Sequence, residues 1–233
     1  MTKTNSSRHV PDPLSIPPSL EYCPQWVAWQ YEERDGKPTK VPINPHTLRR
    51  ASSTDPATWG GFNEAMDAFQ RHSTLAGVGF TFSKDDPFCG VDVDNGIDPA
   101  TGTLKPWAQS IVDDLNSYTE ISPSGHGVKV FVRAKKQDDG CRRPYKDGQI
   151  EIYDSGRFFT VTGRRYPNTP LRVYERHKEI AALCRKVFGK DEKRPRVPAH
   201  QLKQAHGVDA QVLERARRGS KKFDALWRGE WEA

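Results

Sequence analysis

Two stretches of strict alternation constrain this chain more than any other feature. Val91-Asp92-Val93-Asp94 alternates apolar and acidic residues, and Ile150-Glu151-Ile152-Tyr153 repeats the pattern far downstream. Residues two apart on a β-strand point to the same face of a sheet. The apolar residues therefore predict a face packed in a core, with Asp92, Asp94 and Glu151 together on the other face.

Neighbouring carboxylates repel each other, so Asp92 and Asp94 bring no gain to folding by themselves. A divalent cation removes the repulsion, and two such ions ~3.5–4 Å apart can clamp the attacking and leaving oxygens of a phosphoryl displacement. The alternatives are edge-strand carboxylates for the aspartates and a salt bridge from Glu151 to Arg133 or Arg157. We treat the three acids as candidate metal ligands and catalytic residues.

A loop rich in small residues lies between the two acidic stretches. It reads Ser122-Pro123-Ser124-Gly125-His126-Gly127 and is followed closely by Lys129. Glycines and hydroxyl groups let a backbone approach an anion and donate hydrogen bonds to it. The pattern is not that of a Walker A loop. Ser122, Ser124, Gly125 and Lys129 are candidate nucleotide-binding residues, and the alternative is a surface turn with a solvated lysine.

Arg157 and Tyr153 complete the candidate nucleotide site. If strands at 149–153 and 158–162 pair across a short turn, Arg157 lies near the mouth of the site, where a guanidinium binds phosphate oxygens bidentately. The alternative is a turn-flanking surface arginine. Tyr153 shares the strand face of Glu151.

The hydrophobic pattern predicts an α+β domain with a mixed or antiparallel central sheet flanked by helices. We expect 77–82 and 88–94 to be adjacent strands joined by a polar turn, and 149–153 and 158–162 to be a final strand pair. The remaining predicted strands are 25–31, 37–43 and 127–133, and the predicted helices are 55–71, 106–115 and 174–188.

Composition divides the chain into four predicted segments. Residues 1–20 are rich in proline and polar residues and are expected to be a disordered lead-in. The catalytic domain is expected at 21–189 and a linker at 190–207. Residues 208–233 are predicted to begin a truncated helical segment, because an apolar-aromatic patch near the end has little left to pack against.

Charge and cysteine usage limit the function classes. The net charge is +6, which favours polyanionic partners such as nucleic acid but also suits an ordinary basic enzyme. The four cysteines are far apart without a C-x-x-C pair, so neither a zinc site nor a disulfide framework is indicated. No apolar leader or membrane-length run is present. We expect a cytoplasmic protein without a membrane partner.

The motifs in their order resemble a known family. Asp-Val-Asp, Ser-Pro-Ser-Gly-x-Gly, Glu-Ile-Tyr and Arg-Phe-Phe-Thr-Val-Thr-Gly, spread over residues 22–165, resemble the primase-polymerase domain of the archaeo-eukaryotic primase superfamily. The branch is that of phage- and plasmid-encoded bifunctional primase-polymerases. The resemblance implies an RRM-like core, two divalent cations (Mg²⁺ or Mn²⁺), NTP or dNTP substrates and a single-stranded DNA template. It also implies a possible helicase domain or partner and a bacterial host cell.

Carried over position by position, the resemblance implies that Asp92, Asp94 and Glu151 are the metal ligands. It implies that Ser124 and Gly125 belong to the nucleotide-binding loop, and that Arg157 is the arginine near the triphosphate. The chain departs from the pattern at Lys129, where many relatives carry histidine. A lysine can hold phosphate as a point charge, but it is charged at neutral pH and cannot act as an imidazole does.

Template-dependent nucleotidyl transfer, as a DNA primase or DNA polymerase, is the function favoured by these residues. A metal-dependent nuclease could use the same carboxylates and lysine, although the Glu-x-Lys of many nucleases is absent at Glu151-Ile152-Tyr153. A replication module that binds single strands or an origin without catalysis is a further alternative. Nucleotide-sugar transferases also use Asp-x-Asp, but nothing in the sequence indicates a sugar pocket.

Overall fold

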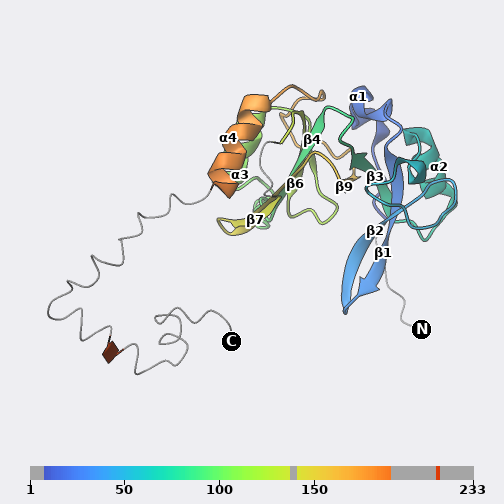
Figure 1. The fold of residues 1–233 in the computed structure, drawn as a ribbon, viewed down its shortest axis with the longest axis horizontal. Coiled ribbons are helices and arrows are strands. Elements are labelled where there is room, and N and C mark those ends of the chain that lie inside the picture. The colour runs from blue at the N-terminus through green and yellow to red at the C-terminus, as the bar shows by residue number, and fades with distance from the viewer. Residues whose placement is uncertain (1–7, 137–140, 190–213, 216–233) are drawn as a thin grey trace. The chain divides into compact units, whose positions relative to one another are not determined.

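The computed structural model describes residues 8–136, 141–189 and 214–215 (Figure 1). The chain divides into two units, residues 1–189 and 190–233, and every element named below belongs to the first. The linker predicted at 190–207 lies outside the described residues, as does the helical segment predicted at 208–233 apart from residues 214–215. No helix in the described part of the chain is long and apolar enough to cross a membrane.

The described elements are strands and short helices, with five consecutive strands between the last two helices. In chain order they are η1 (Pro13–Ser15), α1 (Pro18–Glu21), β1 (Trp26–Arg34), β2 (Lys37–Ile43), η2 (Pro56–Thr58), α2 (Phe62–Arg71), β3 (Gly77–Phe82), β4 (Phe88–Asp94), α3 (Pro106–Leu115), β5 (Thr119–Ile121), β6 (Val128–Arg133), β7 (Arg142–Tyr145), β8 (Gly148–Tyr153), β9 (Arg157–Val161) and α4 (His177–Phe188).

The strands form two antiparallel sheets. Sheet A has the order β2-β1-β3-β9, and sheet B has the order β5-β6-β4-β8-β7. The predicted α+β class is confirmed. The strands are nevertheless shared between two sheets, where the sequence pattern had suggested one central sheet.

Two predicted strand pairings are wrong. β3 and β4 lie in different sheets, and so do β8 and β9, because β3 pairs with β9 while β4 pairs with β8. The turn between β3 and β4 carries the chain from one sheet to the other. The buried carboxylate of Asp86 fixes this turn by accepting hydrogen bonds from the Ser83 N–H (2.8 Å) and from the Phe88 N–H and Gln25 amide (each 2.5 Å).

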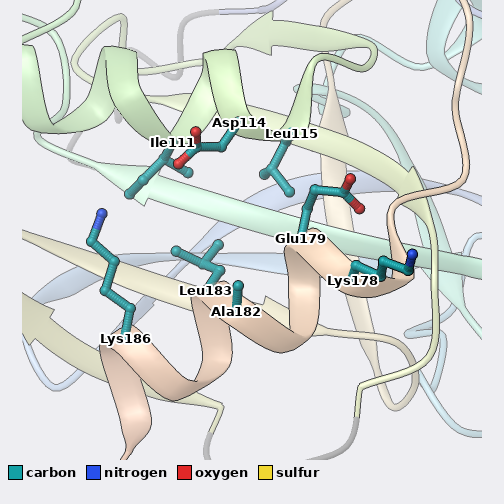
Figure 2. A pocket seen from close by; sticks show the side chains of 8 residues that line it. All are labelled: Ile111, Asp114, Leu115, Lys178, Glu179, Ala182, Leu183 and Lys186. Carbon is teal, nitrogen blue, oxygen red and sulfur yellow. The ribbon is translucent and has the colours of Figure 1, made fainter.

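One face of sheet B packs against α3 and α4. The valines and isoleucines of β4, β6 and β8 form a buried cluster with these helices, as the alternation predicts. Ile111 and Leu115 of α3 face Ala182 and Leu183 of α4 across a groove of about 360 Å³ (Figure 2). Each fully buried aliphatic side chain of this cluster contributes ~1.5–3 kcal/mol to stability.

The other face of sheet B meets sheet A. Phe88 and Phe131 join a second buried cluster that also includes residues of β1, β3, β9 and α2. The approach depends on Gly90 of β4, because a Cβ there would overlap the rings of Phe82 and Phe159. The acids of β4 and β8 lie on this same face and belong to neither buried cluster.

The helix predicted from Asp55 to Arg71 is interrupted. Asp55 caps only the short turn η2, and α2 begins at Phe62. Between them Gly60 forms a β-bridge with Trp26, in which each N–H donates to the other carbonyl at 2.9 Å. Because these backbone groups are committed to β1, they cannot join an α-helical ladder.

The described part of the predicted lead-in, residues 8–20, is ordered against the domain. The His9 N–H donates to the Ala76 carbonyl at 2.7 Å and the Asp12 N–H to that of Thr162 at 3.0 Å. Leu20 of α1 is fully buried. The proline content had suggested disorder, but the prolines begin η1 and α1, where a missing N–H is tolerated.

Candidate active site

A row of charged side chains crosses sheet B. In the strand register, Glu120 lies opposite Lys129, Lys129 opposite Asp92, Asp92 opposite Glu151, and Glu151 opposite Arg142. Directly opposed residues of an antiparallel pair project to the same face of the sheet. The row therefore sets two acids side by side at its centre, with a cation on each outer side.

Asp94 adds a third carboxylate to this face. It follows Asp92 by two residues on β4 and lies opposite Gln149. The Gln149 amide donates to Asp94 Oδ2 at 3.3 Å and to Glu151 Oε1 at 2.9 Å, so one side chain ties both acids together. The structure thus brings Asp92, Asp94 and Glu151 onto one face, as the alternation predicts. Their chemical roles stay predictions.

Cations contact two of the three acids. Lys129 forms a short ion pair with Asp92, and only 7% of the lysine side chain is exposed, so it is not a solvated surface residue. Arg142 Nε and an Arg157 guanidinium nitrogen lie 3.3 Å and 3.4 Å from the Glu151 carboxylate. Of the two salt bridges considered for Glu151, the one to Arg157 is therefore present. Arg142 is a second partner that the sequence did not indicate.

Asp94 lies near carboxylates of like charge. Burial, followed by the neighbouring charge of Asp92, raises the pKa of Asp94, and Lys129 acts in the opposite direction. Burial and the charge of Glu151 also raise the pKa of Tyr153, to about 12. The Asp94 carboxylate thus occupies a position where a bound cation would relieve electrostatic cost.

These groups line a cavity of about 1060 Å³. Of the predicted site residues, Asp92, Asp94, Ser122, Ser124, Lys129, Glu151 and Arg157 form part of its wall. Gly125 and Tyr153 do not. Tyr153 lies beside the site, with the Arg157 guanidinium 5.1 Å from the centre of its ring.

The Ser-Gly loop is a tight turn at the edge of this cavity. The Ser122 N–H donates to the Gly127 carbonyl and the Gly125 N–H to the Ser122 carbonyl, each at 2.9 Å. Gly125 has a φ of +78°, and a Cβ on Gly127 would overlap the Val93 carbonyl oxygen. The two serine hydroxyls lie 3.1 Å apart. The glycines therefore hold the loop against β4 and place two hydroxyl groups on the wall.

The acids offer oxygen ligands for a hard cation but are not gathered into a finished metal centre. Within residues 8–136, 141–189 and 214–215, no three His, Cys, Asp or Glu side chains are grouped closely enough to hold a metal ion. Asp92 Oδ1 is buried, however, and has no hydrogen-bond partner in the described structure. An unpartnered buried carboxylate oxygen is costly. This atom and the oxygen-only ligand set fit Mg²⁺ or Mn²⁺.

The sequence reasoning missed several residues of the cavity wall. Most come from sheet A or from the edge strand β7, and they are Arg34, Lys37, Lys40, Ser52, Ser53 and Arg142. Burial, followed by the charge of Lys129, lowers the pKa of Lys40. The alternation of Lys40 with the buried Val41 and Ile43 was the available signal, because it places the lysine on the face away from the core.

Glu120, at the end of the charged row, was also missed. It is fully buried, and its carboxylate accepts hydrogen bonds from the N–H groups of Thr162 and Gly163 (each 3.0 Å) and from the Tyr118 hydroxyl (2.9 Å). Burial outweighs these hydrogen bonds and raises the pKa of Glu120 to about 7.

This pKa predicts a pH-dependent component of stability. Between the ordinary value of 4.5 and about 7, the folded chain binds a proton at Glu120 that the unfolded chain has released. The component is therefore fully present below about pH 4.5 and is lost as the pH rises through about 7, by ~3 kcal/mol. Glu120→Gln removes it, so the unfolding free energy of the variant relative to wild type should rise between about pH 5 and about pH 8 in urea titrations. Parallel pH profiles would contradict this assignment.

No family model matches the chain. Over 173 residues, 73% of the chain, it is 42% identical to the DNA primase-polymerase of Nitratiruptor phage NrS-1. The chain covers 22% of the length of that phage protein. An identity of this level over most of the chain shows that it carries a phage-type primase-polymerase domain.

Proposed function

We propose that the chain catalyses template-dependent nucleotidyl transfer, as a DNA primase, a DNA polymerase or both, in phage or plasmid replication. The observation that carries the proposal is the convergence of Asp92, Asp94 and Glu151 on one wall of a cavity that is also lined by cations. The name of the similar phage protein agrees with this chemistry.

In this proposal the three acids hold two divalent cations, Mg²⁺ or Mn²⁺. When bound, such ions would supply Lewis-acid activation of a hydroxyl nucleophile and neutralisation of the leaving pyrophosphate. Asp92 has an oxygen available for this purpose, because Oδ1 is buried and unpartnered. Gln149 orients the other two acids through its amide.

The chain's own cations and hydroxyls would bind the triphosphate. Lys129 of β6 forms an ion pair with Asp92, and Arg157 of β9 forms one with Glu151. A polyanionic nucleotide that arrives with its metal ions can take over these cations as partners, because it brings negative charge to the same place. Ser122 and Ser124 would donate hydroxyl hydrogen bonds that orient the triphosphate.

An extension assay tests the proposed function. Wild-type chain is incubated with single-stranded or primed DNA and labelled NTP or dNTP, with Mg²⁺, with Mn²⁺ or with a chelator. We expect incorporation that needs a template and a divalent cation and stops when the cation is removed. Cleavage of DNA without added triphosphate would indicate a nuclease, and DNA binding without incorporation would indicate a non-catalytic module.

A further inference from the structure

The β1–β2 hairpin carries two lysines that the proposed mechanism does not use. β1 pairs with β3 only over Trp26–Trp29, whereas it pairs with β2 from Ala28 to Arg34. The outer half of the hairpin therefore extends beyond the rest of sheet A (Figure 1). Lys37 and Lys40 of β2 both line the cavity that holds the acids.

Neither lysine forms an ion pair with any described residue, unlike Lys129, Arg142 and Arg157, which contact the acids. Lys37 is exposed near the hairpin turn, and Lys40 is partly buried with its ammonium 5.7 Å from the centre of the Trp29 ring. The charges of Asp92 and Asp94 act on Lys40 without forming an ion pair with it, and a partly buried cation that lacks a direct anionic partner costs free energy. The cavity wall thus carries two positive charges that form no ion pair with the described residues and can bind an anion.

The arrangement fits a chain of phosphates better than one nucleotide. Three residues along a strand span ~10 Å, about the rise of three nucleotides in one DNA strand. β2 is the edge strand of sheet A, and Lys37 and Lys40, three residues apart on it, both line the cavity. The cavity volume of about 1060 Å³ also reaches the upper end of the ~300–1,000 Å³ that sites for single small molecules occupy.

The acidic residues of the hairpin do not lie where they would repel phosphates bound at the cavity wall. Glu32 is paired with Arg50 and with Arg34, and neither it nor Glu33 nor Asp35 lines the cavity. The acids on the wall are the three candidate metal ligands of sheet B. The hairpin side of the cavity is therefore positive, and it faces the acids from the opposite sheet.

We propose that Lys37 and Lys40 bind backbone phosphates of the DNA strand whose end or templating base enters the reaction site. This inference rests on the proposed function for the identity of the strand. Lys40 contacts the phosphate nearest the acids, and Lys37 contacts one farther out along the hairpin. The competing interpretation is that Lys40 binds the triphosphate of the incoming nucleotide, which carries the same kind of phosphate group.

Binding of a fluorescein-labelled oligodeoxythymidine, without metal or nucleotide, tests the proposal across a salt series. We expect the double variant Lys37→Ala/Lys40→Ala of the full chain to bind more weakly, with a salt slope reduced by ~1.4, because each single-strand phosphate contact contributes ~0.7. The matched variant Lys37→Arg/Lys40→Arg should keep the slope. Lys178→Ala, an exposed lysine at the α3–α4 groove (Figure 2), should also keep it.

A second arm measures the affinity for a non-hydrolysable dNTP with Mn²⁺. We expect this affinity to be unchanged in the double alanine variant. An unchanged oligonucleotide slope in a folded variant, or a loss confined to nucleotide binding, would overturn the proposal, as would a wild type that does not bind the oligonucleotide. The assay needs no catalysis. If the wild type lacks polymerase activity but the double alanine variant shows the reduced slope, the proposed function is refuted and the role of the lysines is supported.

Discussion

Replacing Asp94 by asparagine is expected to reduce nucleotide incorporation by ~10³-fold without lowering the stability of the fold. A metal ligand contributes several kcal/mol to a transition state of phosphoryl transfer, and each 1.4 kcal/mol is about tenfold in rate. The same carboxylate is half-buried beside Asp92 and Glu151. Because asparagine removes that like-charge repulsion, the free energy of unfolding should stay constant or rise by ~1 kcal/mol.

Single-turnover primer extension and urea unfolding on the same preparations measure both quantities. Asp114→Asn is the matched control, since Asp114 is an exposed acid of α3 beside the α3–α4 groove (Figure 2). It should retain wild-type incorporation. A folded Asp94→Asn variant with wild-type incorporation would refute the assigned role, whereas a large loss of stability would indicate that Asp94 is a structural residue.

Replacing Lys129 by methionine is expected to destabilise the fold by ~3–5 kcal/mol, the cost of breaking a buried ion pair by removing one partner. The Lys129 and Asp92 side chains are 7% and 13% exposed, and the lysine ammonium also lies 4.5 Å from the centre of the Phe159 ring. Methionine keeps most of the apolar stem of the side chain but removes the ammonium that pairs with Asp92.

A double-mutant cycle separates this pairing from simple loss of packing. Lys129→Met combined with Asp92→Asn should recover most of the stability, because neither charge then remains buried alone. Urea unfolding of the four proteins gives the coupling energy. Additive losses of stability would show that the ion pair contributes nothing. The two single variants, Lys129→Met and Asp92→Asn, should both be inactive in primer extension.

Local periodicity predicted where strands and helices lie. The bounds of β2 and α3 agree with the predicted 37–43 and 106–115, because alternation and helical spacing are properties of the segment itself. Pairing was harder to predict, since a short connection such as 83–87 suggests a hairpin. Asp86, in the turn that carries the chain into the second sheet, accepts one of its hydrogen bonds from Gln25, which is far away in the sequence.

The short edge strands could not be found from pattern. β5 has three residues, and β7 contains Pro144 and has no buried residue, so neither gives a hydrophobic period. With β7 the sequence reasoning also missed Arg142, a partner of Glu151. Edge strands commonly carry charge and proline, which removes the signal that identifies central strands.

The candidate site was accessible to sequence reasoning in part. Asp92, Asp94 and Glu151 share a face because strand periodicity fixes the side of the sheet, and β4 pairs with β8 in a register that sets Asp92 against Glu151. Arg157 reaches Glu151 even though its strand lies in the other sheet. The wall formed by Lys37 and Lys40 depends on how the two sheets face each other, and no local pattern contains that information.

The most direct test of the account counts the divalent ions that the acids hold. Mn²⁺ binding is titrated by electron paramagnetic resonance in the presence of a non-hydrolysable triphosphate, with wild type and Asp94→Asn side by side. We predict two ions for each wild-type chain and a lower number for the variant. An equal number of bound ions in the two proteins would contradict the claim that these carboxylates form the catalytic metal site.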